Sequence, residues 1–179
     1  MVITGGLNLD KKKHILITGP NNPLGQCFIN GLIRNYPNSK LFSLSRSVKI
    51  NNFGNFVNHI PFDLSKDNYH FPENIDILVH IASAVPSATQ NHDEYFQINY
   101  NGSKRLIENI KFSNDAKIFN ISTSSVYDDP ISKVLTEDSK KTTKDPYGLS
   151  KMMFEQYLKD RFEHSTIKFL TCRIPVLLV

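Results

Sequence analysis

The stretch from His14 to Gly25 has the sequence HILITGPNNPLG, in which an apolar run stops at a turn and restarts as a helix. This order predicts a strand, a phosphate-binding loop and a helix. Gly19 lets the backbone turn tightly, and a helix that begins near Pro23 points its free N–H groups and positive dipole end at a pyrophosphate. Asn22 suits the N-cap, Pro23 suits the first helical position, and Gly25 allows close packing of helix on strand. We therefore expect a dinucleotide to bind here.

The spacing Gly19-x-x-Asn22-x-x-Gly25 is the dinucleotide-binding fingerprint with asparagine in place of its middle glycine. Leu24 opens the apolar face of the helix that follows. Short patterns of this kind also occur by chance, so an ordinary strand, turn and helix of an α/β protein is the alternative interpretation.

Composition favours one globular domain, because 179 residues with 40% hydrophobic side chains can bury a substantial core. The net charge is +4, and the compact basic run is Lys11-Lys12-Lys13, just ahead of the first strand. No basic stripe interleaved with aromatic residues follows it. We therefore expect a solvated leader over residues 1–13 and no nucleic-acid partner.

The two cysteines, Cys27 and Cys172, lie far apart in apolar settings and match no metal-ligand spacing. We expect buried reduced thiols and no metal site. Residues 1–10 lack the pattern of a signal peptide, and the longest apolar run, residues 174–179, is too short to span a bilayer. The sequence therefore predicts a cytoplasmic protein without a membrane partner.

Apolar strand-like runs alternate with amphipathic or helix-length segments along the chain. This alternation predicts an α/β fold over residues 14–179, a Rossmann-like doubly wound parallel sheet with helices on both faces. The ligand crevice of such a sheet lies beyond the carboxyl ends of the strands. The expected strands are His14–Thr18, Lys40–Ser45, Phe56–Phe62, Asp76–Ala82, Lys117–Thr123 and Thr166–Ile174, and the expected main helices are Pro23–Tyr36, Asn91–Phe112 and Asp145–Glu163.

Three strand ends carry residues suited to a cofactor. The second strand ends at Ser45-Arg46-Ser47, where no carboxylate can accept from a ribose 2′-hydroxyl; Arg46 suits a 2′-phosphate, so NADP is favoured and NAD is the alternative. Asp63, after the third strand, can accept from an adenine amino group or, alternatively, cap a helix. Ala82, after the fourth strand, lets a ribose or nicotinamide pass close to the backbone, whereas His80 before it is expected in the core.

The signal for chemistry is Tyr147 and Lys151, four residues apart on one side of a helix. A tyrosine of pKa about 10 is a poor proton shuttle at neutral pH, but a nearby ammonium lowers that pKa toward the working range. An exposed helix pair is the alternative interpretation. Thr123 favours a catalytic site over an exposed helix pair, because it closes an apolar strand and emerges at the same carboxyl edge of the sheet. A hydroxyl opposite a tyrosine acid can polarise a carbonyl while a nicotinamide delivers hydride.

Together these motifs resemble the extended short-chain dehydrogenase/reductases, in particular their nucleotide-sugar epimerase, dehydratase and ketoreductase branch. The resemblance covers nearly the whole chain after Lys13. It rests on Thr18-Gly19-x-x-Asn22-x-x-Gly25, Asp63-Leu64, His80-Ile81-Ala82, Asn99-Tyr100-Asn101-Gly102-Ser103, Ile121-Ser122-Thr123-Ser124-Ser125-Val126-Tyr127, and Tyr147-Gly148-Leu149-Ser150-Lys151 followed by Glu155.

The resemblance implies roles for individual residues. Thr123 matches the family's catalytic serine or threonine, Tyr147 its acid/base, and Lys151 the lysine that contacts the nicotinamide ribose and tunes the tyrosine. Asn99 matches the structural and proton-relay asparagine, and Ser124 is a neighbouring hydroxyl for the substrate. The expected cofactor-binding residues are Gly19, Asn22, Leu24, Gly25, Arg46, Asp63, Leu64, Ala82, Tyr147 and Lys151.

The implied activity is that of an NADP-preferring oxidoreductase-type enzyme acting on a nucleotide-linked sugar, as an epimerase, a dehydratase or a 4-ketoreductase. Pro20 and Pro23 stiffen a loop that is normally glycine-rich, and Asp128 follows Tyr127 where the family usually has glycine. The alternative is a non-catalytic NAD(P)-binding sensor or interaction protein with the same fold.

The chain ends at Val179, where the family continues into further substrate-binding segments. We expect these residues to form a cofactor-binding half that needs more polypeptide for turnover, either its own continuation or a partner chain. The apolar run from Ile174 to Val179 is expected to promote self-association into a homo-oligomer.

Overall fold

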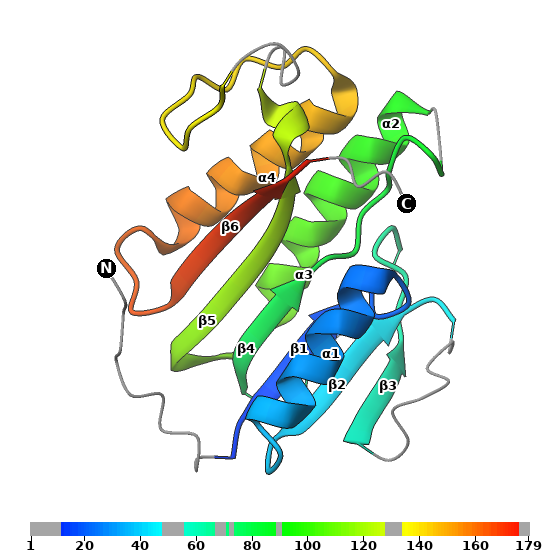
Figure 1. Cartoon of the computed structure of the whole chain (residues 1–179), viewed down its shortest axis with the longest axis vertical. Helices are drawn as coiled ribbons and strands as arrows, with labels where there is room; N and C mark the ends of the chain where they lie inside the picture. The colour runs from blue at the N-terminus through cyan, green and yellow to red at the C-terminus, as the bar shows by residue number, and fades with distance from the viewer. Residues whose placement is uncertain are drawn as a thin grey trace.

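The computed structural model describes residues 12–47, 56–66, 71, 74–88, 91–127 and 134–175. Within them, six parallel strands form one sheet in the order β3-β2-β1-β4-β5-β6 (Figure 1). The direction in which the strands are added reverses between β1 and β4, so the doubly wound α/β fold expected from the sequence is confirmed. The strands are β1 (His14–Thr18), β2 (Lys40–Ser45), β3 (Val57–Pro61), β4 (Ile75–His80), β5 (Phe112–Thr123) and β6 (Lys168–Ile174).

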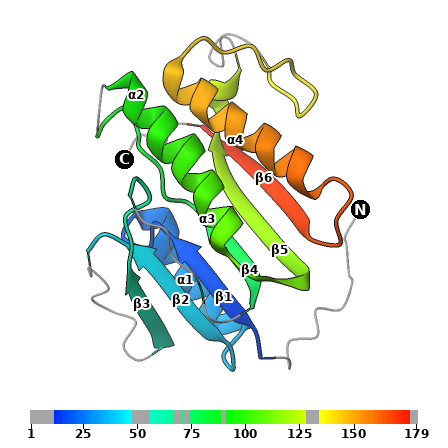
Figure 2. The same ribbon diagram turned by 180° about the vertical axis from the view of Figure 1, so that it is seen from behind.

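Helices cover the two faces of the sheet unequally. Helix α1 packs on one face, over β1 and β2, whereas α3 and α4 pack on the other (Figures 1 and 2). The helices are α1 (Pro23–Asn35), α2 (His92–Tyr95), the π-helix η2 (Phe96–Gly102), α3 (Ser103–Asn109), the 3₁₀ helix η3 (Ser124–Val126) and α4 (Pro146–Phe162).

Strand β1 contributes to a hydrophobic core on each face of the sheet. Ile15 and Ile17 pack in the cluster that contains Ile29 of α1, and Leu16 packs in the cluster that contains Phe154 of α4. Successive side chains of a strand point to opposite faces, so a strand buried on both faces is apolar at every position. This explains why the run that forms β1 does not alternate between apolar and polar residues.

Strand β4 ends at His80, two residues before the end expected from the sequence. The hydroxyl of Thr18 accepts the backbone N–H groups of Ile81 and Ala82, each at 3.0 Å. These bonds take both N–H groups out of the sheet ladder and turn the chain toward the β1–α1 loop.

The long helix expected over residues 91–112 is divided into α2, η2 and α3, and β5 already begins at Phe112. The π-helical turn contains Asn99, whose side chain is buried and hydrogen-bonded to the backbone of Ala84. A π-helical turn re-aims a helical side chain and is often found at functional sites. A tertiary contact therefore sets the local geometry here.

Both cysteines are exposed free thiols, which corrects the expectation of buried ones. Cys27 lies two positions from Gly25 and from Ile29, the buried residues of α1, so it points away from the sheet. On β6, Phe169 packs toward α4 and Cys172 lies on the opposite face, over which Figure 1 shows no helix of the described residues.

The N-terminal end of β1 is held by an ion pair between Lys13 and Asp76, at 3.3 Å. Most of the expected leader and most of the terminal apolar run lie in residues 1–11 and 176–179, outside the described residues. Over the part of the chain that is described, no helix is long and apolar enough to cross a bilayer.

Candidate active site

The loop between β1 and α1 has the turn expected from the sequence. Gly19 has a φ of 69°, a left-handed conformation that glycine adopts without strain, and it packs against the backbone of Ala82. Asn22 caps α1, because its side chain accepts the N–H of Gly25 at 2.7 Å. Gly25 is buried against the loop, and Leu24 packs in the core on the α1 side.

Two prolines reduce the number of N–H groups that this loop offers to a phosphate. Pro20 and Pro23 have none, and the N–H of Gly25 is already bonded to Asn22. Asn21 donates to the carbonyl oxygen of Ser47 at 3.0 Å, and its Oδ1 is buried without a hydrogen-bond partner among the described residues. The residues therefore fit the pyrophosphate of a dinucleotide at the N-terminus of α1, with fewer phosphate donors than a glycine-rich loop has.

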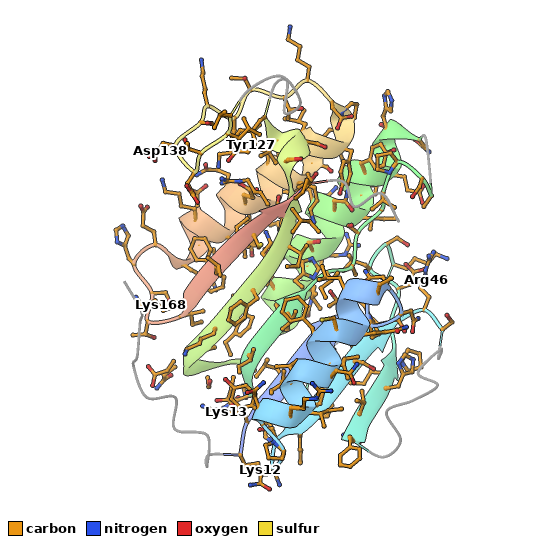
Figure 3. All side chains as sticks on the ribbon, in the orientation of Figure 1. Lys12, Lys13, Arg46, Tyr127, Asp138 and Lys168 are labelled. Carbon is orange, nitrogen blue, oxygen red and sulfur yellow. The ribbon has the colours of Figure 1, made fainter. Side chains whose placement is uncertain are left out.

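Arg46 and Asp63 follow the neighbouring strands β2 and β3. Arg46 is exposed at that edge of the sheet (Figure 3). Asp63 accepts the N–H of Ser65 at 2.9 Å and its hydroxyl at 2.7 Å. Burial would raise the pKa of the Asp63 carboxyl, but these bonds and the charges of Lys66 and Arg46 hold it below its usual value. The carboxylate thus caps its own turn, next to the buried Leu64, and its contact with an adenine stays a prediction.

His80 is a core residue, as expected. Thr18 Oγ1 already accepts two backbone N–H groups, so its own proton is donated to His80 Nδ1 at 2.9 Å. His80 Nε2 then donates to Ser103 Oγ at 2.8 Å. Burial and, secondarily, the charge of Lys151 lower the pKa of His80 to about 3, so the ring is neutral. This chain of bonds ties β1, β4 and α3 together.

Asn99 connects the segment after β4 with α4. Its Oδ1 accepts the N–H of Ala84 at 2.7 Å, and its Nδ2 donates to the carbonyl oxygen of Ala84 at 3.0 Å and to Ser150 Oγ at 3.1 Å. Ser150 directly precedes Lys151. Asparagine has no intrinsic advantage within a helix, so these three bonds account for its buried place. The arrangement is consistent with the structural part of the role that the resemblance implies.

The residues expected to carry the chemistry come together at the carboxyl end of β5. Thr123 is the last residue of β5, and Tyr147 and Lys151 lie in the first two turns of α4. Close approach of α4 to η3 depends on Gly148, because a Cβ there would collide with the carbonyl oxygen of Ser125. The helix can therefore start directly beside Thr123.

Burial raises the pKa of the Tyr147 hydroxyl above its ordinary value, and the charge of Asp145 acts in the same direction. Hydrogen bonds with the side chains of Thr123 and Ser83 oppose this shift but do not outweigh it. The expectation that the tyrosine pKa lies lowered toward the working range is therefore wrong for the free chain, because desolvation is the largest effect on it. The free chain holds Tyr147 as a neutral phenol, the form that donates a proton.

The side chain of Lys151 is buried, with 3% of the residue exposed. Burial lowers the pKa of its ammonium to about 8, and the negative charge of Glu155 limits the shift. At neutral pH most of the ammonium charge remains. A buried lysine that titrates near the working pH can transfer a proton as well as hold a charge.

Sequence reasoning missed Ser83, Ser125 and Tyr95, which surround these groups. Thr123 Oγ1 donates to Ser125 Oγ at 3.2 Å and accepts the N–H of Ser125 at 3.1 Å. Tyr95 packs edge-to-face on Tyr147, with ring centroids 5.7 Å apart. A hydroxyl two residues after Thr123 is a local turn signal that could have marked Ser125. The substrate contact expected of the neighbouring serine, Ser124, stays a prediction.

Comparison with known sequences gives one family. The model of the NAD dependent epimerase/dehydratase family matches residues 15–178. The UDP-glucose 4-epimerase of Yersinia enterocolitica is 34% identical over 160 residues, which make up 82% of this chain and 48% of that protein. The UDP-glucose 4-epimerase of Pasteurella multocida is 39% identical over 94 residues, which make up 50% of this chain and 28% of that protein. The matched part of the chain thus spans about half the length of the Yersinia enterocolitica protein and less of the Pasteurella multocida protein.

Solved structures show the same fold. The UDP-Glc/GlcNAc 4-epimerase of Campylobacter jejuni superposes with a TM-score of 0.76 at 24% identity, covering 90% of this chain and 53% of that one. The UDP-glucuronic acid 4-epimerase of Bacillus cereus, in complex with NAD, gives a TM-score of 0.70 at 22% identity, with coverage of 90% and 55%. Since the family match extends over nearly the whole sequence and the sheet has the order of a dinucleotide-binding fold, the chain belongs to the NAD-dependent epimerase/dehydratase family of the extended short-chain dehydrogenase/reductases.

Proposed function

We propose that this chain is the cofactor-binding and proton-transferring part of a cytoplasmic UDP-sugar 4-epimerase. The observation that carries the proposal is the meeting of Thr123, Tyr147 and Lys151 at the carboxyl end of β5. The relatives named above are UDP-glucose 4-epimerases, which favours epimerisation among the three reactions that the sequence leaves open.

In this proposal Tyr147 exchanges a proton with the sugar hydroxyl that is oxidised and then formed again. The partly buried phenol is protonated in the free chain and can donate to a developing alkoxide. Removal of a proton from the hydroxyl needs the phenolate, which the ammonium of Lys151 stabilises. Thr123 can turn its hydroxyl from Ser125 to the same sugar oxygen and hold it in place. A bound nicotinamide supplies the hydride acceptor.

The proposed cofactor site extends along the carboxyl ends of β1, β2, β3 and β4. The loop from Gly19 to Gly25, with Asn22 and Leu24, would hold the pyrophosphate at the N-terminus of α1. Ala82 lies against this loop, and Asp63-Leu64 lies near the adenine end. The family is NAD-dependent. Arg46, with no carboxylate beside it on β2, favours NADP within this proposal.

The test is a single-turnover assay with the purified chain. NAD or NADP is bound first, and a panel of UDP-hexoses is then added while formation of the reduced nicotinamide is followed by fluorescence. Tyr147→Phe should bind the cofactor nearly as well and slow the reaction by about 100-fold or more. Tyr157→Phe, on the same helix, is the matched control and should leave the rate unchanged. A rate unaffected by Tyr147→Phe would contradict the assignment.

The non-catalytic alternative makes a different prediction for the same assay. A dinucleotide sensor would bind the cofactor and oxidise none of the UDP-hexoses. The loss of two amide donors to Pro20 and Pro23 is the observation that favours this alternative. A chain that binds neither NAD nor NADP would contradict both proposals.

A further inference from the structure

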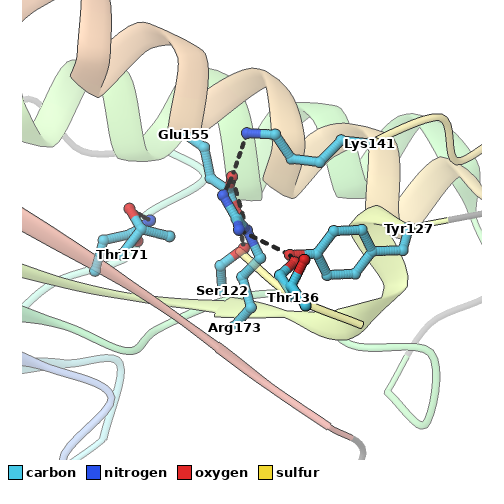
Figure 4. Close-up of polar contacts among 8 residues, drawn as sticks. Ser122, Tyr127, Thr136, Lys141, Glu155, Thr171 and Arg173 are labelled. Atoms are coloured by element: carbon cyan, nitrogen blue, oxygen red, sulfur yellow. Dashed lines mark hydrogen bonds and ion pairs between the residues drawn. The ribbon is translucent and has the colours of Figure 1, made fainter. Parts of the chain in front are cut away.

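Charged and polar side chains form a cluster around a buried carboxylate (Figure 4). At its centre is Glu155 of α4, which is 4% exposed. Its carboxylate accepts the hydroxyl of Ser122 at 2.6 Å, the ammonium of Lys141 at 3.1 Å and Nη2 of Arg173 at 2.9 Å. These partners belong to β5, to the segment that precedes α4, and to β6. One carboxylate thus joins four parts of the chain.

Arg173 fixes the orientation of this carboxylate. Its Nε lies 3.1 and 3.2 Å from the two oxygens of Glu155, so the guanidinium lies alongside the carboxylate rather than touching one corner. Nη1 of Arg173 donates to the hydroxyl of Tyr127 at 2.9 Å, and that hydroxyl donates to the carbonyl oxygen of Thr136 at 3.2 Å. The carboxylate cannot rotate without breaking several of these bonds.

The cluster keeps Glu155 ionised although it is buried. Burial would raise the pKa of this carboxyl, but the hydrogen bonds from Arg173 and Ser122 outweigh it and hold the pKa below its usual value. Buried ion pairs contribute little net stability, and a well-packed apolar set often replaces them without loss. Stability alone therefore does not explain a carboxylate at this position.

The sequence connects this cluster directly to the proposed catalytic residues. Ser122 precedes Thr123 on β5, and Glu155 follows Lys151 by one turn of α4. Among the described residues, Lys151 interacts electrostatically with His80 of β4 and with Glu155 on its own helix, and Tyr147 lies one turn before it on that helix. The charge of Glu155 opposes the effect of burial on the pKa of Lys151.

We propose that Glu155 is a positioning residue of this site: its bond to Ser122 holds the end of β5 that carries Thr123, and its charge balances the buried ammonium of Lys151. The inference rests on the proposed function, because it gives Glu155 a part in turnover. Arg173 and Lys141 act through Glu155, since they fix its carboxylate.

The first test measures the titration of Lys151 in the chain without ligands. NMR of isotopically labelled lysine side chains monitors this titration, and Lys151→Met identifies the Lys151 signal. Lys151 should titrate at about pH 8 in the unchanged chain. In Glu155→Gln it should titrate about one unit lower, because a carboxylate one turn away is lost, whereas Glu155→Asp should restore it. Glu163→Gln, at the exposed end of the same helix, is the matched control. An unchanged titration in Glu155→Gln would overturn the proposal.

The second test is kinetic and is made where circular dichroism shows every variant folded. Ser122→Ala removes the hydrogen bond to Glu155 but leaves the negative charge of Glu155 in place. The kcat of sugar oxidation should therefore fall by about tenfold while KM stays within about twofold. Arg173→Lys loses the side-by-side contact and should act in the same way. A loss expressed in KM alone would overturn the positioning role.

The two proposals fail in different ways. If the unchanged chain binds neither NAD nor NADP, the proposed function fails, and the Lys151 titration still decides the role of Glu155. If Glu155→Gln does not fold, Ser122→Ala and Arg173→Lys carry the kinetic test, and an unchanged kcat in both of them overturns the inference.

Discussion

At the scale of single residues, one physical effect acts in opposite directions on Tyr147 and Lys151. Desolvation raises the pKa of the phenol and lowers that of the ammonium, so each neutral form is favoured. In the free chain Lys151 therefore loses its proton at a lower pH than Tyr147 does. Under the proposed function, the phenolate form of Tyr147 would have to be produced by a change in the site, such as the binding of the positively charged nicotinamide ring.

Arg46 carries the prediction about the cofactor. We expect NADP to bind more tightly than NAD, because a guanidinium follows β2 where a ribose 2′-phosphate would lie. Arg46→Ala should weaken NADP binding by about tenfold and leave NAD binding within about twofold. Calorimetric titration of both cofactors at one salt concentration measures this. A preference for NAD in the unchanged chain, or no loss of NADP affinity in the variant, would contradict it.

His80 carries a prediction about pH and stability. Its pKa is about 3 in the folded chain and 6.5 when unperturbed, so the unfolded chain binds more protons between these values. The stability from neutral His80 is complete above pH 6.5 and is lost as the pH falls toward 3. Urea unfolding at pH 5 should show a loss of about 2 kcal/mol relative to pH 7 from this residue.

The control for this prediction is the exposed His164. His164→Gln should keep the dependence of the free energy of unfolding on pH, whereas His80→Gln should reduce it between pH 7 and pH 5. Equal pH dependence in the two variants would show that His80 is not the group responsible.

At the scale of elements, the distance between α4 and η3 decides whether Tyr147 reaches Thr123. Gly148→Ala should push the start of α4 away from the carbonyl oxygen of Ser125 and lower the free energy of unfolding by about 1–3 kcal/mol. The rate of sugar oxidation should fall more than cofactor affinity does. Chemical denaturation and the single-turnover assay measure the two effects.

Gly31→Ala is the matched control, because nothing lies within 4 Å of a Cβ at that position of α1. A glycine inside a helix is less stable than alanine by about 1 kcal/mol, so this variant should be stabilised and keep its rate. A Gly148→Ala chain as stable and as fast as Gly31→Ala would refute the argument from close approach.

Most elements could be predicted from the sequence because local signals specify them. Both β1 and β2 have the expected bounds, and α4 begins after Asp145, whose side chain accepts the N–H of Gly148 at 2.8 Å. The break near Asn99 could not be predicted, since it depends on bonds to Ala84, which is remote in sequence. The exposure of Cys172 likewise depends on which sheet face has a helix over it.

Within the candidate site, spacing predicted which residues meet but not their protonation. Tyr147 and Lys151 lie one turn apart on any helix, and Thr123 ends a strand, so the sequence could place all three at one edge. The raised pKa of Tyr147 comes from burial, which spacing does not describe. The contact between Thr123 and Ser125 depends on the turn after β5.

At the scale of the whole molecule, helices of the described residues cover only part of one face of the sheet. Helix α1 lies over β1 and β2, and Figure 1 shows no helix of the described residues over β5 and β6 on that side. Leu170 of β6 is 57% exposed there, and Cys172 is exposed on the same face. An apolar surface on the last strand of a sheet favours association with another chain.

We therefore expect the isolated chain of 179 residues to self-associate through the β5–β6 face and to oxidise UDP-hexoses far more slowly than complete UDP-glucose 4-epimerases convert them. A sugar nucleotide is normally enclosed by a concave pocket, and this chain spans 48% of the Yersinia enterocolitica relative. Leu170→Lys should make the chain monomeric in sedimentation experiments. Val134→Lys, at an apolar residue that is 94% exposed and belongs to no strand, should leave association unchanged. A monodisperse monomer with the turnover of complete relatives would contradict both expectations.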